Sequence, residues 1–191
     1  MGREFELKYR ADTEILAAIE KVYTGFEPIS METTYYNTPN GELGKRRWTL
    51  RRRFENGISV CTLKTPGTGG SCGEWEMEED EILKAIPHLI ADGAPEELAA
   101  LTANGLVESC AARFTRLACK ITLEECTVEL ALDSGSLIGG GRELPFAEVE
   151  VELKAGSEDA AVAFTQSLAE QFDLAPEPKS KLQRALELTK R

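Results

Sequence analysis

Polar and apolar residues alternate along the chain from its first ten positions. In residues 4–10, EFELKYR, a charged side chain stands at every second position: Glu4, Glu6, Lys8 and Arg10. Residues two apart share a face of a β-strand but not of a helix, so this period predicts a strand with one charged and one apolar face. A single surface strand of an antiparallel sheet has the same pattern, and the other segments must decide between these interpretations.

The same period recurs in five further segments, which are residues 49–54, 61–64, 73–78, 128–133 and 147–154. Asn-Gly at positions 56 and 57 predicts a hairpin between residues 46–54 and 58–64. A second hairpin is expected from residues 113–123 and 127–135. Helical patterns occupy residues 13–23, 81–90, 95–104, 157–172 and 180–191. The pattern lacks regular strand–helix–strand alternation, so the roughly eight strands are expected to form an antiparallel sheet.

The charged faces could lie outside on water, as in a sandwich or a helix-backed sheet. That arrangement does not explain what offsets the charge repulsion between Glu148, Glu150 and Glu152 on one face of a strand. It also gives the arginine-rich strand 49–54 no acidic neighbour. Closing the sheet would instead bring both signs of charge together inside it, with the helices covering the apolar faces. We therefore predict an α+β fold built on an eight-stranded antiparallel closed β-barrel with helices packed outside.

Composition limits the partners. The chain has 191 residues, with 22 Lys and Arg against 33 Asp and Glu, which gives a net charge of −11. Such a surface repels nucleic acid and anionic membranes, so neither is expected as a partner. The N-terminus lacks the apolar core of a signal peptide, and the five cysteines contain no CxxC spacing. Both features favour a cytoplasmic protein with free thiols and no zinc site.

The inward charges predict the ligand. Acids on some strands suit a hard cation such as Mg²⁺, which prefers carboxylate and phosphate oxygens. Arginines and lysines on other strands suit phosphates. The sequence therefore predicts a small, metal-bound polyphosphate. It offers no Ser-His-Asp or Cys-His arrangement for covalent catalysis, because His88 is the only histidine.

An ordered set of motifs resembles a known family. The motifs are EFELK, YYNTP, LRRR, TLK, EWE, LALDSG, EVEVELKAG and PKSKLQRAL, which run in this order from Glu4 to about Leu188. Together they resemble the CYTH domain, or triphosphate tunnel metalloenzyme, family, and most of all its bacterial inorganic triphosphatases. The resemblance implies one domain over residues 1–191, an eight-stranded antiparallel tunnel and the cofactor Mg²⁺ or Mn²⁺.

The resemblance also implies roles for individual residues. The catalytic positions are matched by Glu4, Glu6, Lys8 and Glu148. The metal-binding positions are matched by Glu4, Glu6, Asp133, Glu148, Glu150 and Glu152. The substrate-binding positions are matched by Lys8, Arg51, Arg53, Lys64, Glu76, Arg116, Lys179, Lys181 and Arg184. An acid such as Glu6 or Glu148, or a second metal, would orient the attacking water.

The chain departs from the family pattern at three places. Asn37 stands where many members have aspartate, and Cys72 and Gly73 stand where many have an arginine before EWE. Phe114 replaces a lysine of some members. Relative to the family pattern, these changes remove one carboxylate at position 37 and cationic side chains at positions 72–73 and 114.

The resemblance implies hydrolysis of the terminal phosphoanhydride of a triphosphate, with inorganic triphosphate as the expected small-molecule substrate. A class IV adenylate cyclase, which converts ATP to cyclic AMP, and a thiamine triphosphatase are alternatives within the family. A polyphosphate-binding module is the non-enzyme alternative. Such a module would keep the cations and lose the metal-binding acids, whereas this chain has both sets.

Overall fold

One antiparallel sheet organises the molecule. The computed structural model describes residues 5–66 and 72–190. Nine strands lie in the order β5-β4-β3-β2-β6-β7-β8-β1-β9. Their bounds are β1 (Glu6–Ala11), β2 (Glu27–Asn37), β3 (Thr49–Glu55), β4 (Ile58–Pro66), β5 (Cys72–Glu78), β6 (Val107–Thr122), β7 (Cys126–Gly139), β8 (Arg142–Gly156) and β9 (Ala175–Pro176). The helices are α1 (Thr13–Val22), α2 (Glu42–Lys45), α3 (Ile82–Ala91), α4 (Glu97–Thr102), α5 (Glu158–Phe172) and α6 (Lys181–Leu188).

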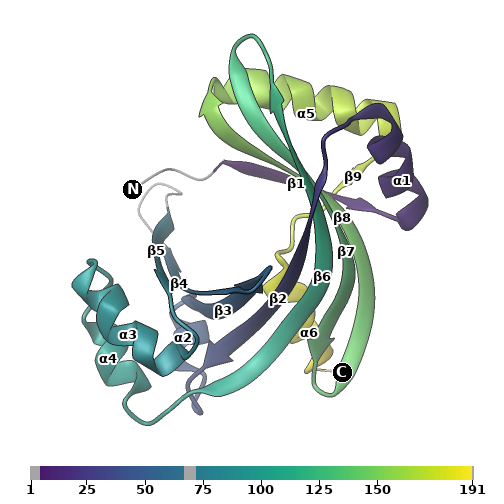
Figure 1. Cartoon of the computed structure of the whole chain (residues 1–191). Helices are drawn as coiled ribbons and strands as arrows, with labels where there is room; N and C mark the ends of the chain where they lie inside the picture. Colours follow the sequence, from purple (N-terminus) through teal and green to yellow (C-terminus); the bar gives the residue numbers. More distant parts are fainter. Residues whose placement is uncertain (1–4, 67–71, 191) are drawn as a thin grey trace.

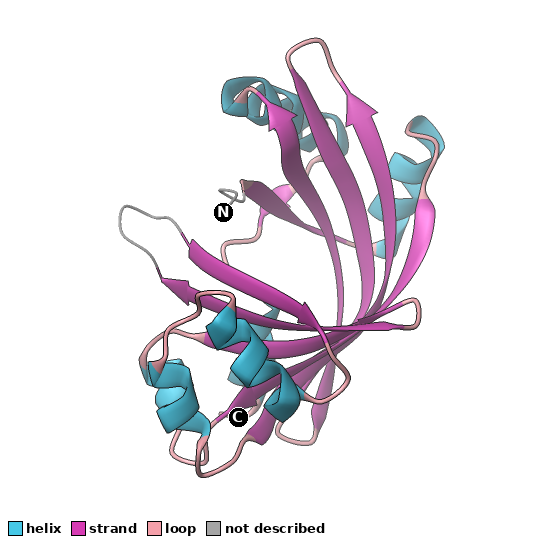
Figure 2. Cartoon of the chain, turned by 60° about the vertical axis from the view of Figure 1, so that its left-hand side comes forward, coloured by secondary structure: helices cyan, strands magenta, loops and turns pink. Residues whose placement is uncertain are grey.

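The fold is α+β, but the prediction of a closed eight-stranded barrel is wrong. The sheet has nine strands and curls into an open trough, with β5 at one edge and β9 beside β1 at the other (Figures 1 and 2). The outer edge of β1 pairs instead with β9, through Tyr9 with Pro176 and Arg10 with Ala175. Pro176 has no N–H to donate and so helps to end the ladder there. Within the described residues, no ladder joins β5 to β1 or β9.

The predicted helices and hairpins form, with small changes of their bounds. Asp12 caps α1, because its side chain accepts a hydrogen bond from the N–H of Ile15 at 2.8 Å. The hairpin of β3 and β4 turns at Asn56 and Gly57, whose φ angles are 45° and 98°. This left-handed geometry is the one that Asn-Gly adopts at low cost. The strand β6 begins six residues earlier than the pattern predicts, at Val107 rather than at position 113.

The apolar faces of the strands lie under helices, as predicted. The helices α1 and α5 cover β1, β7 and β8 on the outside of the trough (Figure 1), and Ile19, Leu130 and Val149 are fully buried there. Helix α3 covers β4 and β5, with Leu63 of β4 and Leu89 of α3 fully buried, and α4 packs against α3. Trp48 and Trp75 pack against the same cluster. Burial of these side chains is the main favourable term for the fold.

The last helix is different, because it packs on the inner face. Its Ala185 and Leu188 contact the cluster that contains Tyr35 and Phe114, two residues that also line the trough. A close approach to β7 requires glycine, since a Cβ at Gly139 would lie 2.3 Å from the carbonyl oxygen of Ala185. The N-terminus of α6 therefore enters the trough. Across the described chain, no helix combines the length and the apolar character that a membrane crossing would need.

Candidate functional site

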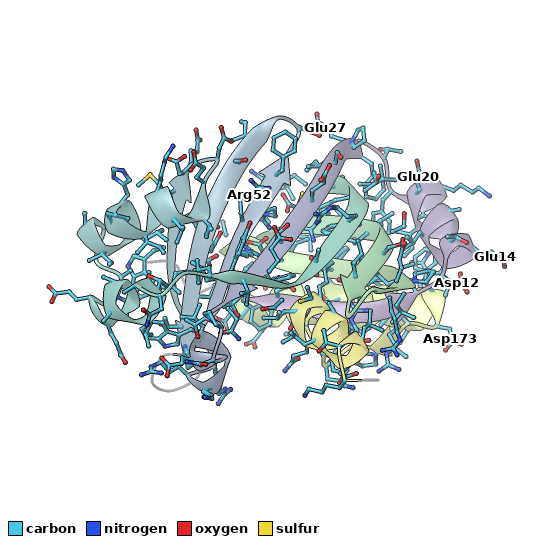
Figure 3. The ribbon with its side chains drawn as sticks, turned by 90° about the horizontal axis from the view of Figure 1, so that it is seen from below. Asp12, Glu14, Glu20, Glu27, Arg52 and Asp173 are labelled. Carbon is cyan, nitrogen blue, oxygen red and sulfur yellow. The ribbon has the colours of Figure 1, made fainter. Side chains whose placement is uncertain are left out.

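The trough contains a cavity of about 750 Å³ whose lining is dominated by charge. Seven cationic residues line it, which are Lys8, Arg51, Arg53, Lys64, Arg116, Lys154 and Lys181. Seven acids line it as well, which are Glu6, Glu55, Glu74, Glu76, Glu129, Glu150 and Glu152. The described lining is thus balanced, although the whole chain carries a net charge of −11. Figure 3 shows the acids Asp12, Glu14 and Glu20 on the outside of the molecule at α1, and Glu27 and Asp173 also lie at its periphery.

One wall of the cavity is rich in arginine. Alternation along β3 turns Arg51 and Arg53 inward, and Lys64 of β4 lies beside them. Lys64 pairs with Glu74 at 3.0 Å, whereas Arg51 Nη2 lies 4.0 Å from both Glu74 and Glu76. The Nε–H group of Arg51 is buried and donates to no hydrogen-bond acceptor among the described residues, whereas Arg53 Nε contacts the carboxylate of Glu55. An unpaired buried donor is costly, so the guanidinium group of Arg51 is prepared to bind an anion, and Arg53 adds a second positive charge beside it.

The opposite wall is acidic. Strand register places Glu6 of β1 beside Glu152 of β8, and Glu152 beside Glu129 of β7, so three carboxylates form one row across neighbouring strands. Lys154 bridges two of them, at 2.7 Å from Glu152 and 3.5 Å from Glu129. Lys8 Nζ lies 3.8 Å from Glu6. Two lysines therefore offset only part of the charge in this row.

A buried ion-pair network lies beneath the acidic wall. Its acids are Asp133, Glu148 and Glu150, of which the first two are fully buried. Arg116 donates to both oxygens of Asp133 at 2.8 Å and also contacts Glu150. The register of β6, β7 and β8 causes this, because it sets position 116 beside 133 and 133 beside 148.

Helix α6 supplies the other cations of the network. Lys181 Nζ lies 2.7 Å from Asp133 and 2.8 Å from Glu150, and it also contacts Glu148. The second oxygen of Glu148 accepts from Arg184. Three acids are thus matched by three cations, which is the condition under which buried charges are tolerated.

The pKa shifts follow from these contacts. Burial raises the pKa of Glu148, although Lys181 and Arg184 oppose the shift. Burial also acts to raise the pKa of Glu150, but Lys181 and Arg116 outweigh it and hold that pKa well below its usual range. For Lys181, burial favours the neutral form, yet Asp133 and the two glutamates raise its pKa overall. The contacts therefore favour the charged forms of Glu150 and Lys181, whereas burial disfavours the charged form of Glu148.

Carboxylates in this region fit a divalent cation. Asp133, Glu148 and Glu150 each place one oxygen within 4.8 Å of the others. Oxygen-only ligands suit Mg²⁺ or Mn²⁺ better than zinc. The row formed by Glu6, Glu129 and Glu152 adds further oxygen donors at the cavity surface.

Comparisons with known proteins identify the family of the chain. Residues 2–186 match the model of the CYTH domain family. The chain belongs to the CYTH domain family. CYTH enzymes depend on metal ions, and the acidic cluster of this chain could bind one.

The relatives of this CYTH protein are described with different activities. The chain is 27% identical to the inorganic triphosphatase of Haemophilus influenzae, in an alignment that covers 96% of this chain and 54% of that protein. The chain thus spans about half the length of this curated relative. A structure described as a proposed adenylate cyclase from Bacillus halodurans superposes with a TM-score of 0.65 at 22% identity, covering 96% and 98% of the two chains.

The description of a third relative mentions both activities, adenylyl cyclase and triphosphatase. A Hippeastrum protein, described as an adenylyl cyclase candidate with a dominant triphosphatase activity, has a TM-score of 0.64 at 14% identity, with 98% and 96% covered. Both structural likenesses show the fold alone, because identity is so low.

The predicted CYTH site residues fall into four groups. The cavity lining contains Glu6, Lys8, Arg51, Arg53, Lys64, Glu76, Arg116, Glu150, Glu152 and Lys181. Three others belong to the buried network beneath it, namely Asp133, Glu148 and Arg184. Lys179 lies apart on the surface, where it pairs with Glu187 at 2.6 Å. Glu4 lies outside the described residues. The structure thus brings most of the predicted set together, while the role of each residue stays a prediction.

Glu129 and Lys154 are among the charged cavity residues to which the sequence-based prediction gives no role. Glu129 completes the acidic row, and Lys154 bridges it. Alternation alone shows that both face inward, but it does not show which residues become neighbours. Only the register between β7 and β8 does that.

The departures from the CYTH pattern also have structural explanations. The Asn37 side chain accepts from the N–H groups of Thr38 and Leu43 at 2.9 and 3.1 Å, so it holds the loop before α2. At Gly73, a Cβ would lie 2.6 Å from the ring of Trp75, which leaves no room for an arginine. The ring of Phe114 lies in the cavity wall beneath Lys181, whose Nζ is 5.0 Å from the ring centroid.

Proposed function

We propose that the protein is a metal-dependent hydrolase that cleaves the terminal phosphoanhydride bond of inorganic triphosphate, giving diphosphate and phosphate. The observation that carries this proposal is the division of charge within one cavity. An arginine-rich wall from β3 and β4 faces an acidic wall from β1, β7 and β8. Phosphoryl transfer depends mainly on positioning and charge neutralisation, which such a cavity can provide.

Each wall has its own part in the proposed reaction. The guanidinium groups of Arg51 and Arg53, with Lys64, would bind the phosphate oxygens. Glu6 and Glu150 are the proposed ligands of Mg²⁺ or Mn²⁺, with Glu152 beside them. When bound, the cation supplies neutralisation of the developing charge. A carboxylate of the acidic wall would accept the proton of the attacking water.

The cavity fits inorganic triphosphate better than a triphosphate that carries an aromatic ring, such as ATP or thiamine triphosphate. Of the aromatic rings in the described lining, Phe114 lies beneath Lys181 and Arg116, at 5.0 and 5.9 Å, and Tyr35 is only 6% exposed. Neither ring has a free face for stacking on adenine or thiamine. The likeness to the Haemophilus inorganic triphosphatase supports the same substrate.

The test compares three substrates. Phosphate release is measured from inorganic triphosphate, ATP and thiamine triphosphate, each with Mg²⁺, Mn²⁺ or a chelator, and cyclic AMP is assayed with ATP. We expect metal-dependent cleavage with a clear preference for inorganic triphosphate. Cyclic AMP with diphosphate would assign a cyclase, preference for thiamine triphosphate would assign a thiamine triphosphatase, and no turnover would leave a binding module.

A matched pair of arginines tests the cavity itself. Arg53 points into the cavity, whereas its neighbour Arg52 points outward and donates to the carbonyl oxygen of Asp80 at 2.9 Å. We expect Arg53→Met to lower kcat/KM by about 10- to 100-fold, the value of one charge-assisted contact. Arg52→Met should leave kcat/KM within about two-fold. Equal losses would contradict the assignment of the cavity as the site.

A further inference from the structure

A row of alternating charges connects the outer edge of β1 with the cavity. It runs from Arg10 through Glu177, Arg184 and Glu148 to Lys181. At one end Arg10 has 61% of its side chain exposed, and at the other end Lys181 lines the cavity, whereas Glu177 and Glu148 between them are 4% and 0% exposed. Every link joins opposite charges, so the position of one group constrains the next.

Glu177 occupies the centre of the connection between β1 and α6. Its side chain is only 4% exposed, and it lies in the segment between β9 and α6. One oxygen accepts from Arg10 Nε at 2.9 Å, and the other accepts from the N–H of Lys179 at 3.0 Å. Arg184 Nη1 lies 3.8 Å from the first oxygen.

The backbone of Glu177 is tied to the cavity wall as well. Its N–H donates to the carbonyl oxygen of Lys8 at 2.9 Å, and Lys8 is one of the cations that line the cavity. The same residue thus contacts β1 with its backbone and both β1 and α6 with its side chain. Burial alone would raise the pKa of Glu177, but the Lys179 N–H and Arg10 lower it overall.

The position of Lys181 depends on how α6 enters the trough. Ser180 caps the helix in a capping box with Gln183, and both Ser180 and Lys181 line the cavity. The cap fixes the first turn of the helix but not its placement relative to β1. The ion pairs of Glu177 connect this end of α6 with β1, in addition to the pairs that Lys181 and Arg184 make with the acids of β7 and β8.

We propose that Glu177 is a positioning residue, which holds the N-terminal turn of α6 against β1 so that Lys181 and Lys8 are set to bind the same polyphosphate. This inference rests on the proposed triphosphate substrate. Glu177 does not line the cavity and so acts through other residues. A shift of about 1 Å in a binding group can cost a large factor in rate or affinity.

A purely structural role predicts a different result. If Glu177 only stabilised the fold, Glu177→Gln would lower the melting temperature and leave the kinetics of the folded protein unchanged. A positioning role predicts that KM for triphosphate rises at a temperature where the variant is fully folded. We expect a rise of about 5- to 20-fold with kcat changed less than about two-fold, because ground-state binding of the phosphates is weakened.

The experiment measures kcat, KM and thermal unfolding for the wild type, Glu177→Gln and a control, with inorganic triphosphate and Mg²⁺. The control is Glu97→Gln, since Glu97 also pairs with an arginine, Arg46, at 2.7 Å, but on the surface of α4. The control should keep KM within about two-fold. Arg10→Gln removes the exposed partner of Glu177 and should raise KM in the same direction by a smaller factor.

The outcomes separate the two proposals. A wild-type protein that does not cleave or bind triphosphate would refute the proposed function. An active wild type together with an unchanged KM in folded Glu177→Gln would refute the positioning role and leave the function intact. If Glu177→Gln does not fold, Arg10→Gln decides, because an unchanged KM in that variant also overturns the inference.

Discussion

Asp133→Asn probes the buried network most directly. Asp133 is fully buried and accepts two bonds from Arg116 at 2.8 Å, and Lys181 lies 2.7 Å from it. Asparagine has nearly the same shape, but it lacks the negative charge. Its NH₂ group would also face an N–H donor of Arg116 or Lys181 in place of the carboxylate oxygen that accepts from it. Removing one partner of a buried ion pair costs about 3–5 kcal/mol, since the remaining charges stay buried.

The loss of stability converts into a measurable shift. For a domain of this size, each kcal/mol lowers the melting temperature by about 2–4 °C, so Asp133→Asn should unfold about 6–20 °C below the wild type. Thermal unfolding followed by circular dichroism measures the shift. The same variant should weaken Mn²⁺ binding, measured by titration calorimetry, by about 10-fold or more, because the carboxylate is either a ligand or the partner that orients one.

A surface pair provides the control. Glu32 lies 3.3 Å from Arg113 with 55% of its side chain exposed, and Glu32→Gln makes the same chemical change there. Exposed pairs contribute about 0–1 kcal/mol, so the control should melt within about 4 °C of the wild type. Equal shifts for Asp133→Asn and Glu32→Gln would refute the reasoning that the network is buried and tightly paired.

The other predictions concern separate parts of the molecule. Burial raises the pKa of Cys61 to about 11 and of Cys110 to about 12, so neither thiol should react with iodoacetamide at pH 8 until the protein unfolds. The fold lowers the pKa of Glu150 from its ordinary value of 4.5, so ionised Glu150 stabilises the folded state above pH 4.5, and this contribution is lost as the pH falls below that value. Glu150→Gln should therefore reduce the dependence of the free energy of unfolding on pH in the acidic range. Gly135→Ala should cost several kcal/mol in urea unfolding, since its Cβ would lie 2.2 Å from a backbone carbonyl oxygen of β6.

Local patterns predicted much of this fold because each depends on neighbouring residues. The two-residue period placed Glu6 and Lys8 on the inner face of β1, and Asn56–Gly57 located the first hairpin. Closure of the sheet was predicted wrongly, because it depends on whether two edges far apart in sequence meet. Nothing in the alternation of β1 showed that Pro176 and Ala175 would pair with its outer edge.

For the candidate site, the sequence predicted which residues take part but not which of them pair with each other. The two-residue period of the strands and the resemblance to the CYTH family identified the charged residues, whereas the pairing of these residues depends on the register between neighbouring strands. The bond between Arg116 and Asp133 requires the alignment of two long strands, β6 and β7. Glu177 had no periodic signal, because it lies in a short irregular segment between β9 and α6. Its contacts arise only when α6 enters the trough.

The distribution of charge has a consequence for how a polyanion reaches the cavity. The described lining holds equal numbers of cations and acids, so the net charge of −11 belongs mostly to the outside. The long-range field therefore slows the approach of free triphosphate, and salt screens this field over about 10 Å at 0.1 M. Added salt should then accelerate encounter, opposite to ordinary electrostatic steering. A triphosphate already complexed with divalent cations meets a smaller barrier, so the outer surface favours the neutralised form of the ligand before any contact is made.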